Sequence, residues 1–230
     1  MRLPSRMFPA MSVLAVSAVF ALHPAPARAQ SGDGTIGRAV SAWSKVKTAR
    51  ATFEQTVTNS LTGSTATARG DYQQQRPGKL SIRFTGPDSG RIVADGKAVW
   101  VYLPSSTPGQ VIKRAATDDS AMPVDFTGQF LDAPREKFDI EDAGRETVSG
   151  RETHVLSLVP KPGTQSEVSF TRAKVWVDDR DALIRQFETV EPSGVTRRVR
   201  ILALELNVPV DRGAFVFTPP RGTRIVDQTK

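Results

Sequence analysis

The sequence contains no cysteine, which excludes disulfide bonds, thiolate metal ligands and a cysteine nucleophile. Histidine is almost as scarce, and outside the N-terminal segment only His154 remains. No ligand-spaced carboxylate cluster accompanies it, no serine sits in a Gly-x-Ser-x-Gly elbow, and "GTIGRA" lacks the strand-glycine-helix context of a phosphate loop. We therefore expect no enzyme, no metal and no cofactor, and interpret His154 as a surface or interstrand residue.

The N-terminus has the pattern of an export signal. Arg2 and Arg6 precede an almost wholly apolar run over residues 10–22, and "APARA" ends in the small-x-small pattern that signal peptidase cleaves. We expect residues 1–29 to be a cleaved signal peptide and 30–230 to be a single domain. The apolar run is short for a membrane span, and no later run approaches the roughly 20 residues needed. With no cysteine for lipid attachment, we expect an exported, soluble protein of the periplasm.

The charge balance gives little indication of a partner. The formal net charge of +7 falls to +4 when Arg2, Arg6 and Arg28 are subtracted (7 − 3 = 4). This mild excess in an exported chain of mixed charge argues against nucleic acid. Ordinary solubility charge, an acidic partner surface and anionic lipid headgroups all remain open.

The chain predicts one amphipathic helix followed by a long series of strands. Ile36, Ala39, Val40, Trp43 and Val46 fall at helical spacing. From "ATFEQTV" to "AFVF", short alternating segments are separated by turn clusters every 8 to 12 residues, which is typical of an antiparallel meander. One irregular region interrupts it, where Met122, Phe126 and Phe130 lie at helix-like offsets. We predict a mainly β (α+β) fold with about 11 strands.

A sheet of this size must curl or close, because strand twist accumulates, and a concave face has to be filled. Two short helices would cover it incompletely. The remaining apolar surface is either unrecognised core or a binding cavity, and the pattern alone favours neither.

The segment "YQQQRPGKLSIRF" leaves a second question open. Leu80, Ile82 and Phe84 alternate with polar residues, as in a half-buried strand. Counting back by twos across the turn, Arg76 shares their face if the register is kept. Arg76 therefore either points into water or lies at the rim of an apolar surface that is not an ordinary core.

Several short motifs, taken in order, resemble the periplasmic lipoprotein carrier family, LolA and its relatives. They are a glycine before an Arg-Pro turn, an Asp-Gly-Lys before a Trp-x-Tyr strand, an asparagine before Phe-x-Phe, and a closing Pro-Pro-x-Gly. The positions are Gly70, Arg76, Pro77, Asp95, Gly96, Lys97, Trp100, Tyr102, Asn207, Phe215, Phe217, Pro219, Pro220 and Gly222. The resemblance runs from the amphipathic helix to the C-terminus.

The resemblance implies an unclosed half-barrel whose concave apolar face is covered by the N-terminal helix and a short helical lid. It implies a monomeric chaperone that receives acylated lipoproteins from an inner-membrane ABC transporter and passes them to a LolB-like outer-membrane acceptor. It also implies that Arg76 lies inside and bonds lid-helix carbonyls when the cavity is empty. Gln73, Gln74 and Gln75 depart from the family's usual aromatic or aliphatic residues, which predicts a more polar wall there.

These considerations give the predicted site. Arg76 is the predicted lid latch, and Met122, Phe126 and Phe130 are assigned to the lid helix. The predicted acyl-chain cavity consists of Leu80, Ile82, Phe84, Trp100, Tyr102, Trp43, Val40 and Phe53.

Two other uses remain as alternatives. One keeps the fold and makes the protein a lipid carrier or an envelope-stress sensor of misplaced lipoproteins. The other is an extracytoplasmic enzyme acting on a lipid-like substrate with His154 as base.

Overall fold

The structure is a computed structural model that describes residues 27–86, 89–116, 125–165 and 168–229. The predicted signal peptide therefore falls almost wholly outside the described residues, and so does Met122. Among the described helices, none is long and apolar enough to cross a membrane.

Twelve strands form one sheet in the order β12-β6-β5-β4-β3-β2-β1-β11-β10-β9-β8-β7. Neighbours pair antiparallel except β12, which runs parallel to β6. The strands are β1 (Thr48–Asn59), β2 (Thr65–Gln75), β3 (Lys79–Thr85), β4 (Arg91–Asp95), β5 (Ala98–Tyr102), β6 (Gln110–Ala115), β7 (Phe138–Val148), β8 (Arg151–Pro160), β9 (Arg172–Asp178), β10 (Ile184–Val190), β11 (Val195–Leu206) and β12 (Arg224–Gln228).

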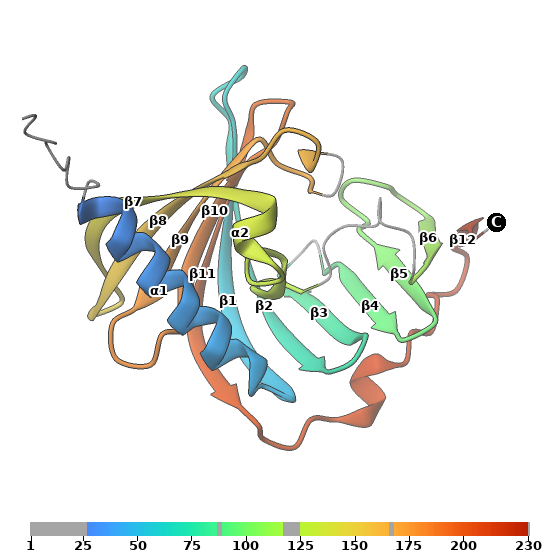
Figure 1. Cartoon of the computed structure of the whole chain (residues 1–230). Coiled ribbons are helices and arrows are strands. Elements are labelled where there is room, and N and C mark those ends of the chain that lie inside the picture. The colour runs from blue at the N-terminus through green and yellow to red at the C-terminus, as the bar shows by residue number, and fades with distance from the viewer. Residues whose placement is uncertain (1–26, 87–88, 117–124, 166–167, 230) are drawn as a thin grey trace, which may run out of the picture.

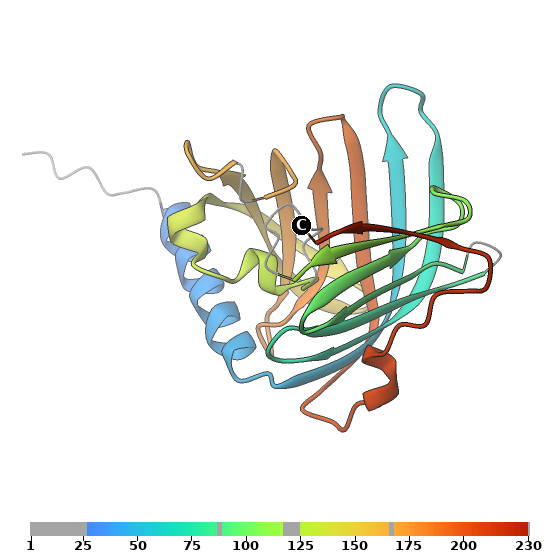
Figure 2. The same cartoon turned by 90° about the vertical axis from the view of Figure 1, so that its right-hand side faces the viewer.

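The sheet is strongly curled but does not close, because β12 and β7 remain as its two ends. Strands β3 to β6 turn across the direction of β1, β2 and β11, so that the sheet wraps around a concave side (Figure 2). The predicted mainly β, unclosed half-barrel is thus confirmed, with twelve strands rather than about eleven.

Helical segments lie over the concave side (Figure 1). Helix α1 (Ala27–Ser44) crosses the end of the sheet formed by β7, β8 and β9. Beside it lie the 3₁₀ turn η1 (Gly128–Phe130) and the short helix α2 (Pro134–Lys137). We refer to residues 125–137, which contain η1 and α2, as the lid segment. The buried face of α1 carries Ile36, Ala39 and Trp43, as the helical spacing predicts.

Cross-strand register fixes which side chains face the lid. Tyr72 pairs with Ile82, Ile82 with Ile92, and Ile92 with Val101. Directly paired residues share a face of the sheet, and Tyr72, Ile82 and Ile92 belong to the main buried cluster. The β2–β3 turn therefore keeps the register on which the sequence argument depended.

The predicted strand "AFVF" is wrong. Residues Arg212–Phe215 form the 3₁₀ helix η3 on the convex side, where it contacts β3 and β4. The Asp211 carboxylate accepts a hydrogen bond from the Gly213 N–H at 2.9 Å, which caps this turn. Ala214 and Phe215 are buried where η3 packs on the outside of the sheet, whereas Val216 is exposed. The last strand, β12, comes after the Pro-Pro step instead.

Candidate functional site

The concave face and the lid enclose an apolar interior with very little free space. The remaining cavity measures about 20 Å³, which is close to the minimum for one water molecule. Its walls come from α1, the four strands β1, β2, β10 and β11, the lid and the β9–β10 turn: Ala39, Trp43, Ala49, Ala51, Phe53, Tyr72, Phe126, Thr127, Leu131, Ala182, Leu183, Ile184, Ile201 and Leu204. In this closed form the lid's own side chains fill the hollow.

Phe126 is the central plug of the lid. Its ring stacks on Tyr72 at 4.7 Å between centroids and meets the edges of Phe53 at 5.1 Å and Phe187 at 5.8 Å. Phe130 lies behind it, 5.2 Å from Phe187. Such rings remove large apolar areas from water, so this cluster holds the lid closed chiefly by the hydrophobic effect.

Arg76 lies at the seam between α1 and the lid. One guanidinium nitrogen donates to the backbone carbonyl of Trp43 at 3.1 Å, and the other lies 3.4 Å from the Asp125 carboxylate. The guanidinium carbon is 4.8 Å from the centre of the Trp43 ring. The side chain is 31% exposed, so Arg76 occupies the rim of the apolar surface rather than bulk water.

Asp125 is the functional residue that the sequence analysis missed. One of its oxygens accepts from Gln74 at 2.8 Å and from Arg76, and the other accepts from the backbone N–H groups of Thr127 and Gly128. A Cβ at Gly128 would collide with this carboxylate. The pattern Asp-Phe-Thr-Gly is a usable turn signal, because aspartate commonly accepts backbone N–H bonds two and three residues on.

Gln74 explains one departure from the family pattern. It lies on the concave face of β2, is buried, and donates to the lid rather than lining an apolar wall. Next to it, burial and then the Asp125 carboxylate raise the pKa of Tyr72 well above its usual range. The polar wall predicted at residues 73–75 is thus local to the lid contact.

The structure brings together most of the residues predicted for the cavity. Trp43 and Phe53 line it, Leu80 and Ile82 belong to the surrounding buried cluster, and Phe84 and Val40 pack against that cluster.

Trp100 and Tyr102 are corrections. Trp100 pairs with Val93 and Tyr102 with Arg91, one residue out of step with the concave pair Ile92 and Val101, so both point to the convex side. There the Trp100 ring stacks on Phe217 at 5.6 Å and its N–H donates to Asp95 at 3.1 Å. Apolar residues on both faces of β5 made the two orientations indistinguishable from the sequence.

The N-terminal half of α1 is fixed to the sheet by separate contacts. His154 on β8 is buried, bonds the Asp142 carboxylate at 2.9 Å, and lies 3.5 Å from the Thr35 hydroxyl of α1. The predicted interstrand position is correct, but the residue is not at the surface. Since Thr35 is only 3% exposed, this set of three side chains forms a buried contact between α1 and the strands β7 and β8.

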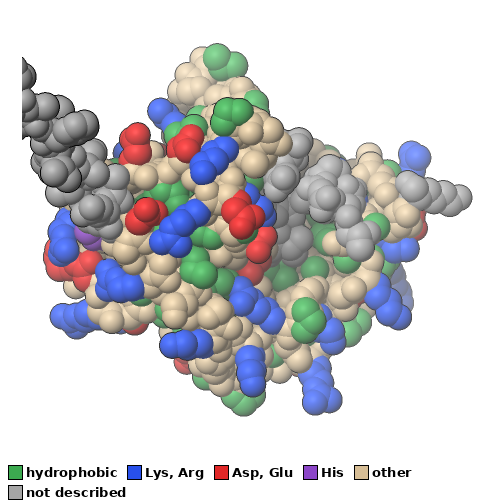
Figure 3. Space-filling model, viewed as in Figure 1, with side chains coloured by type: hydrophobic (Ala, Val, Ile, Leu, Met, Phe, Trp, Pro, Cys, Tyr) green, Lys and Arg blue, Asp and Glu red, His purple; other side chains and the backbone are tan. Residues whose placement is uncertain are grey.

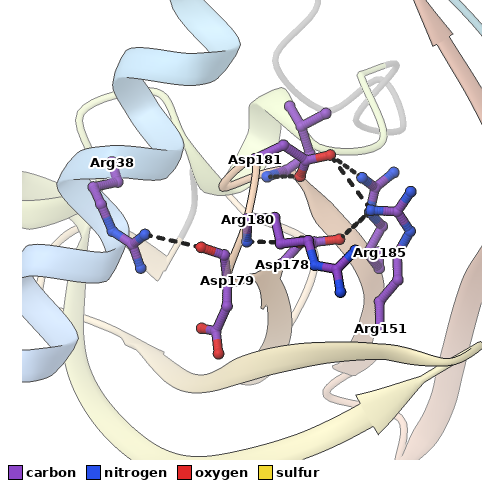
Figure 4. A network of polar contacts seen from close by, with 8 residues as sticks. Arg38, Arg151, Asp178, Asp179, Arg180, Asp181 and Arg185 are labelled. Carbon is purple, nitrogen blue, oxygen red and sulfur yellow. Dashed lines mark hydrogen bonds and ion pairs between the residues drawn. The ribbon is translucent and has the colours of Figure 1, made fainter.

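A network of arginines and aspartates supports the β9–β10 turn beneath α1 (Figure 4). Asp178 accepts from Arg151 at 2.8 Å and Arg185 at 3.0 Å, and Arg185 also contacts Asp181. Burial alone would raise the pKa of Asp178, but the Arg180 backbone N–H and the two guanidinium groups outweigh it and lower that pKa to about 2. The turn carries Ala182, Leu183 and Ile184 into the cavity wall.

The outer surface over the lid carries charges of both signs. Figure 3 shows Lys and Arg interspersed with Asp and Glu over α1 and the lid, with apolar side chains visible between them. Among the residues that the structure describes, no group of three or more His, Asp and Glu side chains could hold a metal ion.

Sequence comparison gives the family. Residues 44–218 match the family described as "Outer membrane lipoprotein carrier protein LolA". The chain belongs to this family. Carriers named outer-membrane lipoprotein carrier protein share 29% identity over 188 residues in Klebsiella pneumoniae and 30% over 187 in Salmonella paratyphi B, each covering 81% of this chain and 84% of the relative. An uncharacterized conserved protein from Thermus thermophilus has the same fold, with a TM-score of 0.53 at 12% identity over 86% of this chain and all of that one.

Proposed function

We propose that this chain is a periplasmic chaperone that shields the acyl chains of lipoproteins. It receives them from an inner-membrane ABC transporter and delivers them to an outer-membrane acceptor. Membership of the carrier family supports this, and so do relatives named for lipoprotein transport. The observation that carries the proposal is Arg76, which joins the C-terminal end of α1 to the lid across a closed apolar interior.

The closed form explains how such a carrier could release its cargo rather than bind it too tightly for transfer. Each buried methylene contributes about 0.8 kcal/mol, so one acyl chain of roughly 14 carbons offers on the order of 10 kcal/mol. A cavity of about 20 Å³ cannot admit that chain, so loading must displace Phe126 and break the Arg76 bonds. The lost contacts offset part of the gain, which keeps the cargo releasable.

The proposal includes no catalysis and no cofactor. The relatives' family is one of carriers. His154 is engaged between Asp142 and Thr35 beneath α1, so its place in the fold supports a structural role.

Recovery of the natural cargo tests the proposal directly. The protein is purified from the periplasm of its native host, and the bound molecules are identified by mass spectrometry. We expect acylated proteins. Free lipids alone would instead support a lipid carrier, and a bound anti-sigma factor would support a stress sensor.

Arg76→Leu tests the latch separately. We expect normal folding and lipoprotein loading but delivery to acceptor-containing membranes slowed by about tenfold or more, since the closed form no longer competes with the cargo. The matched control is Arg83→Leu on the convex face of β3. Unchanged delivery by Arg76→Leu would refute the latch.

A further inference from the structure

A second, larger hollow adjoins the apolar cavity. It is an open groove of about 520 Å³ between α1 and the lid. Val40, Trp43 and Ser44 form one wall, Gly128, Gln129, Leu131 and Asp132 form the other, and Arg76 and Asp125 lie between them.

Trp43 and Leu131 line both the groove and the inner cavity. They therefore form the partition between an apolar interior and a polar exterior. A molecule with an apolar tail and a polar end would match this sequence of environments, with its tail inside and its polar end in the groove.

The groove carries no surplus positive charge. Arg76 is paired with Asp125 at 3.4 Å, and Asp132 is paired with Lys137 at 2.6 Å. Of the residues lining it, Arg76 is cationic and Asp125 and Asp132 are anionic. A carboxylate or phosphate bound here would lose its hydration beside two carboxylates. It would find no cationic side chain in the lining that is free of an anionic partner, so its binding would be unfavourable.

Polar atoms at this seam lack partners in the closed form. Within the described part of the chain, Trp43 Nε1, Gln74 Oε1 and Thr127 Oγ1 are buried without a hydrogen bond. All three residues are more than nine-tenths buried. The Gln74 and Thr127 residues also bond Asp125 through their other groups, and the Trp43 carbonyl bonds Arg76. Of these three residues, Trp43 lines the groove, so its indole N–H is the buried donor that a ligand bound there would pair with.

We propose that this groove binds the neutral ester or amide linkage at the head of an acyl chain and discriminates against a free carboxylate. The tail enters between Trp43 and Leu131. Arg76 exchanges its bond to the Trp43 carbonyl for the ligand's carbonyl oxygen, and the Trp43 indole N–H, which has no partner in the closed form, is a second donor. This inference rests on the proposed function, because it specifies which acylated molecules the same site accepts.

A matched ligand pair tests the specificity. Palmitate and palmitoyl ethanolamide have the same tail, one with a charged head and one with a neutral amide. Each displaces a polarity-sensitive fluorescent dye from the full-length mature protein at pH 8. We expect the amide to bind at least about tenfold more tightly than palmitate.

Asp125→Asn identifies the cause. The substitution leaves Arg76 without an anionic partner, so palmitate should gain about tenfold in affinity relative to the amide. A weaker latch favours both ligands alike and does not alter this ratio. Asp71→Asn removes the same charge from the outward-facing side of β2 and should change neither. If Asp125→Asn does not fold, Asp132→Asn, whose carboxylate is 78% exposed, should shift the preference in the same direction.

Two results would overturn the inference and leave the carrier intact: equal or tighter binding of palmitate by the unaltered protein, or a preference that survives both substitutions. If neither palmitate nor palmitoyl ethanolamide displaces the dye, the proposed function is overturned, and this subsite with it.

Discussion

The two ends of helix α1 are held to the molecule in different ways. The N-terminal half approaches β7 so closely that a Cβ at Gly32 would lie 3.4 Å from a backbone nitrogen of that strand. It is also bonded through Thr35 and Arg38, the latter to the Asp179 carbonyl at 3.3 Å. At the C-terminal end, Trp43 is buried and its carbonyl accepts from Arg76, which is shared with the lid. Just after the helix, Asn207 bonds the backbone of Lys45 and Lys47. The N-terminal half is thus bonded directly to the sheet, whereas the last turn of the helix is linked through Arg76 to the lid. We therefore expect the helix to open from its C-terminal end.

Asp178→Ala should have the largest effect, because it damages the support of the fixed end. The substitution leaves Arg185 without its buried partner, and breaking such a pair costs about 3–5 kcal/mol. Urea denaturation followed by circular dichroism measures the loss. Asp179→Ala is the control, since that carboxylate bonds the exposed Arg145. Equal losses in the two variants would show that the network does not carry the support.

Acid should weaken the ion pairs of Asp178 in a defined pH range. The native pKa of Asp178 is about 2, below the roughly 3.9 of an unfolded chain. Its contribution, at most about 3 kcal/mol, is therefore complete above about pH 5 and is lost as the pH falls toward 2. The free energy of unfolding, measured between pH 5 and pH 2.5, should fall less steeply in Asp178→Asn than in the unaltered protein. Parallel curves would contradict the assignment.

Arg76→Leu should have a smaller effect on stability, within about 1 kcal/mol, because the pair is partly solvated. Its effect should be local. In hydrogen exchange, the amides of Phe130 and Leu131, which bond carbonyls within the lid, should exchange about tenfold faster. Amides around Thr35 should not change. Acceleration along the whole of α1 would mean that the helix opens as one unit.

The sequence predicted the closed form only in part, and the reason is physical. Alternation placed Leu80, Ile82 and Phe84 on one face because polar residues separate them and the turn keeps register. Trp100 was misplaced because β5 is apolar on both faces, and η3 covers part of the convex side. Asp125 was overlooked because its partners, Gln74 and Arg76, are about 50 residues away, and no local pattern encodes that contact.

Arg135→Ala should have the smallest effect on stability, and it tests how the N-terminal half of α1 is held. Arg135, in the lid, bonds the Asp33 carboxylate at 3.2 Å and its carbonyl at 2.8 Å, so it joins the lid to the fixed end of α1. Both side chains are more than half exposed, and such pairs contribute about 0.5 kcal/mol or less. If the fixed end is redundantly held, unfolding and the exchange of α1 amides will hardly change. A loss of more than about 1.5 kcal/mol in the free energy of unfolding, or faster exchange near Thr35, would show that the N-terminal half of α1 depends on this surface pair. The contacts of the lid with the two ends of α1 would then be of comparable strength.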